Sequence, residues 1–132
     1  MDWILDKGRP ICPQICEQVC LRIMLGLFAP GERLLSVREI ALAAGVNPNT
    51  VQKSFDLLEQ KGILCSQRGS GWYVSADTEP ARLAYEALLR EKTEAYFASM
   101  RTLGMNEAQT KAYVSQWHAD NDTQKGTVND GE

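Results

Sequence analysis

Apolar residues recur at helical spacing early in the chain and predict a helix that begins near Ile11. Its expected core-facing stripe consists of Ile15, Val19 and Ile23, with Leu21, Met24 and Leu25 beside them. Pro13 is compatible with the first turn, because its missing amide hydrogen would have no helical partner there. Gly26 and Pro30 bracket the end of this helix, since proline cannot continue it.

Two further helices begin at recognisable capping residues. Ser36 and Glu39 have the spacing of a capping box, and the helix that they start should end at Gly45. Asn47 and Pro48 then supply an N-cap and a first-turn proline for a third helix. Its inward-facing residues are predicted to be Val51, Phe55 and Leu58, with Leu57 as a further candidate. Two short helices joined by a tight turn indicate a helix-turn-helix.

The pattern becomes strand-like after Gly62. Residues 63–66 and 72–74 are predicted as two short strands around a glycine-rich turn at 67–71. A hairpin that follows a helix-turn-helix is typical of the winged variant. Residues 1–9 mix apolar and charged side chains and fit either a short strand or a packing arm.

Helical spacing returns from Pro80 and predicts a two-helix appendage. The first helix should end at Gly104, and Asn106 with Gln109 has the spacing of another cap. The predicted apolar side of the first helix consists of Ala81, Tyr85, Leu88, Leu89, Tyr96, Met100 and Leu103. The second helix carries Ala112, Tyr113 and Trp117. The predicted fold class is therefore mainly α with a small β-hairpin wing, namely a winged helix-turn-helix followed by a C-terminal two-helix appendage.

Composition and charge narrow the class of protein without deciding its function. A chain of 132 residues with 44% apolar residues suits one compact domain and an appendage. No apolar run approaches the roughly 18 residues that span a membrane, and the first 20 residues lack the pattern of a signal peptide, so a cytoplasmic location is expected. Net charge is −3, but residues 33–71 carry an excess of two positive charges. This excess is too small to establish nucleic-acid binding alone.

The cysteines invite a sensor interpretation that the spacing only partly allows. Cys12, Cys16 and Cys20 follow each other at intervals of four and line one helix stripe. Eight helical residues rise about 12 Å, so one zinc ion with sulfur bonds of about 2.3 Å cannot reach both ends of the row. Core packing is favoured over thiol or metal sensing, with Cys65 as the fourth free thiol. His118 is expected at a helix end or on the surface, and no metal site is predicted.

No pattern of catalytic residues stands out. The chain lacks a recognisable nucleophile, histidine and acid set, a paired-carboxylate pattern and a nucleotide-binding glycine loop. Gly69 and Gly71 lack the strand-to-helix context of a phosphate loop. We therefore expect neither an enzyme nor a cofactor.

Residues 10–74 resemble the DNA-binding domain of the GntR family of bacterial regulators. The resemblance runs through PGERL at 30–34, SVREIA at 36–41, GVNPNTV at 45–51, LEQKGIL at 58–64 and RGSGWYV at 68–74. Leu35 departs from the family, which usually has proline there, and the change should reduce rigidity without loss of function. By length and helical pattern alone, the C-terminal part resembles the YtrA-type branch, whose two C-terminal helices serve dimerisation.

The start of the second helix of a helix-turn-helix enters the major groove of DNA. The candidates there are Asn47, Asn49, Thr50, Gln52 and Lys53. Asn49 suits an adenine edge, Thr50 a thymine methyl group or a phosphate, and Lys53 a guanine or a phosphate.

The resemblance implies that Arg38 reaches the groove edge or the backbone and that Arg68 enters the minor groove. Ser36 and the free amides at the helix starts are candidate phosphate anchors, and Gly69 and Gly71 allow close approach of the wing backbone. Each residue also has a purely structural alternative, above all Asn47 as an N-cap and the two glycines as turn formers.

The sequence thus predicts a transcription regulator that binds a palindromic operator in double-stranded DNA as a homodimer, most simply as a repressor. The expected dimerisation residues are Tyr85, Leu88, Leu89, Tyr96 and Met100. The expected division is a DNA-binding domain at 1–77, a helical dimerisation region at 78–118 and a disordered tail at 119–132. The alternative is a winged-helix module that binds another protein. Control by a small-molecule effector near the C-terminal helices, or by protein abundance alone, stays open.

Overall fold

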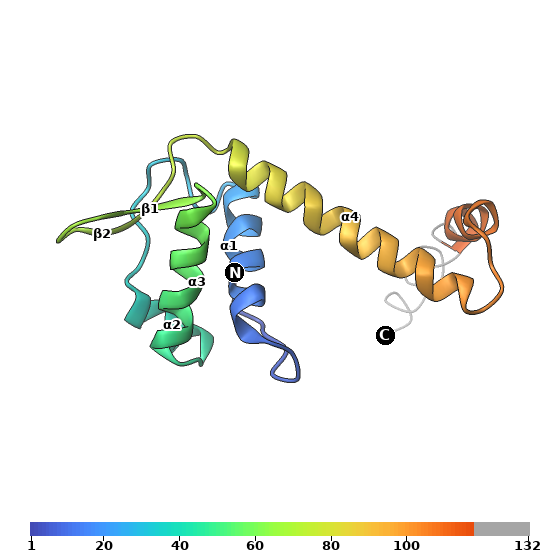
Figure 1. Ribbon diagram of the computed structural model, residues 1–132, viewed down its shortest axis with the longest axis horizontal. Helices are drawn as coiled ribbons and strands as arrows, with labels where there is room; N and C mark the ends of the chain where they lie inside the picture. Colours follow the sequence, from blue (N-terminus) through green and yellow to red (C-terminus); the bar gives the residue numbers. More distant parts are fainter. Residues whose placement is uncertain (118–132) are drawn as a thin grey trace, which may run out of the picture. The chain divides into compact units, whose positions relative to one another are not determined.

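The computed structural model describes residues 1–117, which form two compact units, Met1–Leu88 and a second that begins at Leu89 (Figure 1). The elements in chain order are α1 (Ile11–Met24), α2 (Val37–Ala44), α3 (Pro48–Gln60), β1 (Leu64–Gln67), β2 (Gly71–Val74) and α4 (Glu79–Arg101). Residues 107–117 are also helical. The predicted fold class is confirmed. His118 and the predicted tail lie outside the described residues.

The core of the first unit lies where α1 and α3 pack together. Three residues of α1, Ile15, Val19 and Ile23, and three of α3, Val51, Phe55 and Leu58, are buried there, as predicted. The flanking assignments were less accurate. Met24, Leu25 and Leu57 are exposed, and Leu21 is only half-buried. Met24 is the last residue of α1 and Leu25 is its C-cap, so both lie at the end of the helix, beyond the part that packs in the core.

The two predicted helix starts are confirmed in detail. Ser36 Oγ accepts a hydrogen bond from the Glu39 amide at 3.1 Å, and the Glu39 carboxylate accepts one from the Ser36 amide at 3.0 Å. Gly45 ends α2 with a φ of +70°, a left-handed conformation that glycine adopts without strain. Asn47 caps α3, and Pro48 occupies its first turn.

The wing is a hairpin supported by a segment that the sequence did not reveal as extended. In the antiparallel pair β1–β2, Leu64 lies opposite Val74. The chain before α2 joins them, because the Leu34 amide donates to the Trp72 carbonyl at 2.8 Å and the Val74 amide donates to the Glu32 carbonyl at 2.9 Å. In Figure 1 the hairpin extends beyond α3. Its backbone is thus fixed to the loop that leads into the helix-turn-helix.

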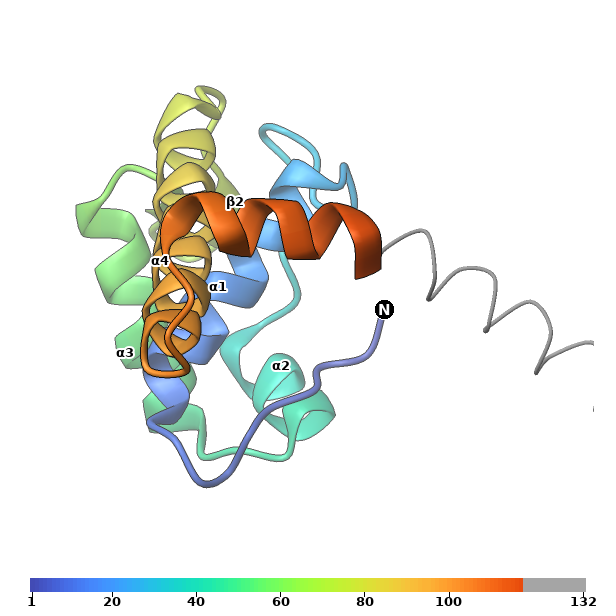
Figure 2. The same cartoon turned by 90° about the vertical axis from the view of Figure 1, so that its right-hand side faces the viewer.

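Residues 1–10 contain no strand and form a packing arm, because Trp3 and Leu5 pack against the core. The Arg22 side chain of α1 holds the arm by donating to the Met1 and Asp2 carbonyl oxygens, each at 3.1 Å. Figure 2 shows the arm running past α1 and α2. Of the two alternatives for this segment, the packing arm is therefore correct.

The start of α4 belongs to the first unit, because Ala81 is buried in its core cluster. In the second unit, Asn106 and Gln109 make the predicted reciprocal cap, with bonds of 2.8 and 2.9 Å. Leu103 was assigned to the apolar side of the helix but is 77% exposed, because α4 ends at Arg101. Over residues 1–117, no helix has both the length and the apolar character needed to cross a membrane.

Candidate nucleic-acid interface

The start of α2 leaves one cation free beside a capped helix end. The capping box fixes Ser36 and Glu39, and the Ser36 amide bond is the main reason why the pKa of the Glu39 carboxyl is lowered. Arg38 follows at the second position of the helix and is exposed. Within residues 1–117, Arg38 makes no ion pair. Its guanidinium is therefore available to an external anion.

The start of α3 contains one residue that caps the helix and several polar side chains that are wholly or partly exposed. The Asn47 side-chain oxygen accepts a hydrogen bond from the Asn49 amide at 2.8 Å, so Asn47 acts as the N-cap of α3. The cap uses only the backbone of Asn49, and the Asn49 side chain is exposed. Thr50 is half-buried and Lys53 is exposed. The first two turns thus present an amide, a hydroxyl and an ammonium group.

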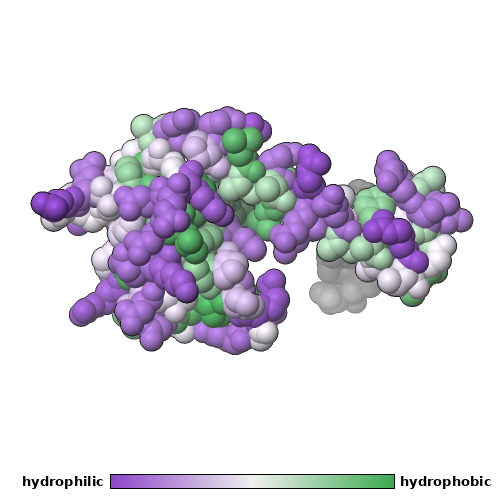
Figure 3. All heavy atoms as spheres, viewed as in Figure 1, coloured by the Kyte–Doolittle hydropathy of each residue, from purple (hydrophilic) through white to green (hydrophobic). Residues whose placement is uncertain are grey.

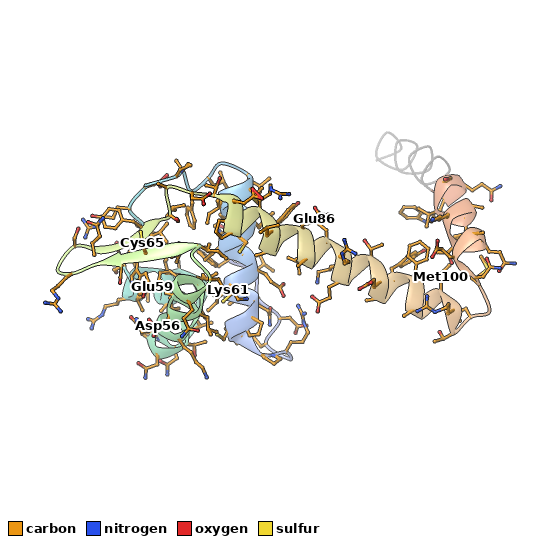
Figure 4. The ribbon with its side chains drawn as sticks, turned by 45° about the horizontal axis from the view of Figure 1, so that its top comes forward. Asp56, Glu59, Lys61, Cys65, Glu86 and Met100 are labelled. Carbon is orange, nitrogen blue, oxygen red and sulfur yellow. The ribbon has the colours of Figure 1, made fainter. Side chains whose placement is uncertain are left out.

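Gln52 is less free than the sequence suggested. Its side-chain amide donates to Asp56 Oδ1 at 3.0 Å, one turn further along α3. Figure 4 shows Asp56 and Glu59 on this helix. Because a carboxylate already holds the amide, Gln52 is a weaker candidate for base contact than Asn49.

The turn of the wing is exposed and polar. Arg68 is exposed and, within residues 1–117, has no ion-pair partner. Gly69 and Gly71 have φ values of +75° and +113°, so both serve as turn formers, whatever else they contact. The free end of the hairpin is hydrophilic in Figure 3. An arginine at the end of a narrow hairpin can enter a groove that a helix cannot.

Arg33 was missed by the sequence analysis. The backbone of Arg33 forms an antiparallel β-bridge with Tyr73 at the edge of the wing. Its side chain lies beside Gly71, where a Cβ atom would be 3.4 Å from Arg33 Nε. Its charge also contributes to lowering the pKa of Glu39 at the start of α2. Arg33 therefore places a cation between the wing and α2. No local pattern in the sequence singled out Arg33, because its place beside the wing depends on the backbone bonds between residues 32–34 and β2.

These groups come from elements that pack directly on one another. α2 and β1 both contact α3. Trp72 of the wing makes an edge-to-face contact with Phe55 of α3, with ring centroids 5.4 Å apart. The helix starts and the wing are thus held by a shared core.

The thiols of α1 face the interior. Cys20 is buried and Cys12 and Cys16 are half-buried, whereas Cys65 lies exposed on the wing (Figure 4). Burial raises the pKa of Cys16 to about 12 and that of Cys20 to about 11. Cys16 Sγ also donates to the Ser54 carbonyl oxygen at 3.6 Å. Among the described residues, no group of three His, Cys, Asp or Glu side chains could hold a metal ion.

The winged helix-turn-helix is similar in sequence to known bacterial regulators. The model of the bacterial regulatory proteins of the gntR family matches residues 13–74, from the first turn of α1 to the end of β2. The HTH-type transcriptional regulator YhcF of Bacillus subtilis strain 168 is 34% identical over 107 residues, which cover 81% of this chain and 88% of YhcF. The HTH-type transcriptional repressor YtrA of the same organism is 40% identical over 73 residues, covering 55% of this chain and 56% of YtrA.

A solved structure extends the likeness to the C-terminal helices. The GntR family transcriptional regulator from Listeria monocytogenes superposes with a TM-score of 0.75 at 32% identity. The match covers 85% of this chain and 98% of that one. Its coverage therefore includes the appendage as well as the winged helix.

Proposed function

The chain belongs to the GntR family of DNA-binding transcription regulators, and we propose that it acts as a homodimeric repressor on a palindromic operator. As a regulator of this family it is not an enzyme, in agreement with the sequence analysis. The observation that carries the proposal is the set of exposed polar groups at the starts of α2 and α3 and at the wing turn. Arg38, Asn49 and Arg68 are exposed while the elements beneath them are fixed by the core.

Three kinds of DNA contact follow from this arrangement. Asn49 meets a base edge in the major groove, and Thr50 and Lys53 meet either a base or a phosphate there, since the start of a recognition helix enters this groove. Ser36, Arg38 and the free amides at the helix starts meet the phosphate backbone. Arg68 enters the adjacent minor groove, with Gly69 and Gly71 allowing the backbone to approach. Asn47 and Gln52 serve these contacts indirectly, as the cap of α3 and as a partner of Asp56.

The apolar residues along α4 support the dimer part of the proposal. Leu89 and Tyr96 of α4 are 45% and 41% exposed, and Tyr85, Leu88 and Met100 are half-buried. Figure 4 shows Met100 near the end of α4. A groove of about 820 Å³ beside this surface is lined by Tyr96, Phe97, Val114 and Trp117 together with polar residues. Burial of these apolar groups by a second copy would remove them from water and give one reading head per half-site.

The proposal that the protein is a repressor is supported by its similarity to YtrA. YtrA, with which this chain shares 40% identity over the aligned region, is described as a repressor. A dimer bound across a promoter excludes RNA polymerase without needing an activating surface. The measurement is transcription from a promoter that contains the operator, with and without the protein. Increased transcription in the presence of the protein would contradict repression and leave DNA binding intact.

Oligomeric state and operator affinity test the dimer directly. Tyr96→Lys places a charge in the proposed interface and should yield a monomer by analytical ultracentrifugation, with much weaker operator binding. Leu83→Lys is the matched control, because Leu83 is exposed and helix geometry places it about 140° around α4 from Tyr96. A chain ended after Leu88 keeps Ala81 in the core and should behave like Tyr96→Lys. A dimer of unchanged affinity in both variants would contradict the proposal.

A protein-interaction module is the competing function. It predicts that Arg38→Ala and Arg68→Ala bind DNA as the parent does, at all salt concentrations. Loss of affinity in these variants supports the DNA-reading assignment instead.

An effector remains a separate expectation. Of the aromatic residues on the C-terminal helices, Tyr96 and Trp117 line the same groove, whereas Tyr85 is not among its lining residues. A ligand there could change DNA affinity only by favouring one separation of the two reading heads over another.

A further inference from the structure

The N-terminal arm, residues 1–10, precedes the region matched by the family model, yet it is tightly fixed to the reading head. The Arg22 guanidinium, in a residue only 3% exposed, lies 3.8 Å from the centroid of the Trp3 ring. Together with its bonds to the Met1 and Asp2 carbonyl oxygens, this contact anchors the beginning of the arm to α1. The arm is therefore an ordered part of the first unit.

A second anchor shapes the turn at the end of the arm. Gln14 of α1 is 5% exposed, and its side-chain oxygen accepts the Asp6 amide at 2.7 Å. The Gln14 side-chain nitrogen donates to the Asp6 carbonyl at 2.9 Å and to the Pro10 carbonyl at 3.0 Å. Because one buried amide holds both sides of the turn, the position of the intervening Lys7 is fixed.

This turn places Lys7 next to the helix-turn-helix. Lys7 Nζ donates to the Gly45 carbonyl oxygen at 2.8 Å. Gly45 ends α2, and Asn47, two residues later, caps α3. The ammonium group thus lies beside the turn that leads into the recognition helix.

The charge of Lys7 is not neutralised by its neighbours. The adjacent Asp6 carboxylate accepts the Gly8 amide at 2.9 Å and pairs with Arg9 Nε at 3.0 Å. Lys7 itself is exposed and has no ion-pair partner in residues 1–117. An ammonium group has three donor hydrogens, and the Gly45 carbonyl uses one of them, so two can serve another acceptor.

We infer that Lys7 is a further DNA contact, which binds a backbone phosphate beside the start of α3. The inference rests on the proposed function, in which α3 enters the major groove and brings the phosphates of the groove edge toward this turn. A phosphate contact carries no sequence information but fixes the orientation of the reading head. The arm thereby adds a contact that the family-matched region, residues 13–74, does not contain.

A purely structural role for Lys7 makes a different prediction. A cation at the C-terminal end of a helix stabilises that end through the helix dipole, whether or not DNA is present. Removal of such a cap lowers thermal stability but leaves the number of neutralised phosphates unchanged. The salt dependence of DNA binding separates the two roles, because it reports that number.

The test uses the full chain and a duplex of about 30 base pairs, long enough for two half-sites one helical turn apart. The duplex is recovered from a random pool by selection with the parent protein. Affinity is measured by fluorescence anisotropy between about 50 and 200 mM salt for Lys7→Gln, Lys7→Met and Lys7→Arg. Lys61→Gln is the matched control, since it removes the same charge from the opposite end of α3. Circular dichroism shows whether each variant is folded.

For both neutral variants we expect the slope of log affinity against log salt to become shallower by about 0.9 per protomer. Lys7→Arg and Lys61→Gln should keep the parental slope. An unchanged slope in Lys7→Gln and Lys7→Met, with or without a lower melting temperature, overturns the inference. Arg38→Ala distinguishes failure of the Lys7 inference from failure of the proposed DNA-binding function. If Arg38→Ala and Arg68→Ala weaken binding while the Lys7 variants do not, only the role of Lys7 is wrong.

Discussion

The guanidinium group of Arg33 lies alongside Gly71, where a Cβ atom would approach Arg33 Nε to 3.4 Å and Nη2 to 3.6 Å. The two residues belong to different segments, the loop before α2 and the first residue of β2. The Leu34 amide, which donates to the Trp72 carbonyl oxygen at 2.8 Å, holds these two segments together. A methyl group at position 71 would thus meet Arg33 at ordinary van der Waals distance, so the φ of +113°, rather than packing, favours glycine there.

Gly71→Ala should weaken DNA binding more than Gly69→Ala. The φ of +113° at Gly71 lies well outside the left-handed region that other residues can adopt, and a side chain forced into it costs about 1–3 kcal/mol. Gly69 has a φ of +75°, close to the left-handed region, and open space in its Cβ direction, so alanine should be less strained there. Thermal melting and operator affinity of the two variants provide the comparison. Equal effects would contradict this ranking of the two backbone conformations.

Asn49→Ala should relax base preference without unfolding α3. The N-cap bond uses the Asn49 backbone amide, which the substitution keeps. If the side chain pairs with an adenine edge through two hydrogen bonds, discrimination at that base pair should fall by roughly 1–3 kcal/mol. The measurement is affinity for a panel of operators with single base changes. Gln52→Ala serves as the control and should change the panel less, and an unaltered profile for Asn49→Ala would count against base reading.

Acidification should remove part of the contribution of the capping box to stability. The pKa of Glu39 is lowered from its ordinary value of 4.5, chiefly because the Ser36 amide donates to its carboxylate. A group whose pKa is lower in the folded state stabilises the fold above its unfolded pKa, and this contribution is lost as the pH falls through the folded value. The melting temperature of the parent should therefore exceed that of Glu39→Gln near neutral pH, and the difference should shrink below about pH 4. A constant difference across this range would contradict the interpretation.

Thiol reactivity should follow burial. The thiolate is the reactive species, and burial raises the pKa of Cys16 to about 12 and that of Cys20 to about 11. Iodoacetamide at mildly alkaline pH should modify the exposed Cys65 first and spare Cys16 and Cys20, as read by peptide mass spectrometry. All four cysteines should react in denaturant. Rapid modification of Cys16 in the folded protein would revive the thiol-sensor alternative.

The amino-acid sequence by itself determined the helix starts, the turn positions and the order of the elements. Ser36 with Glu39 and Asn106 with Gln109 were predicted as caps and are observed as caps. These interactions join residues three positions apart, so their geometry follows from helix formation alone. The same local signals located the start of α3 and the wing turn, and with them most of the candidate DNA contacts.

The tertiary structure alone decided which groups from distant segments meet. Lys7 reaches Gly45 across 38 positions of the chain, and Arg33 meets Gly71 only because the segment before α2 joins the wing. It also decided that Gln52 is held by Asp56 and that Met24 and Leu25 are exposed although they belong to an apolar run. The physical reason is that periodicity specifies which face of an element is apolar, whereas packing decides where that face ends and which polar groups approach it. Such contacts depend on the path of the whole backbone, and no short stretch of sequence records that path.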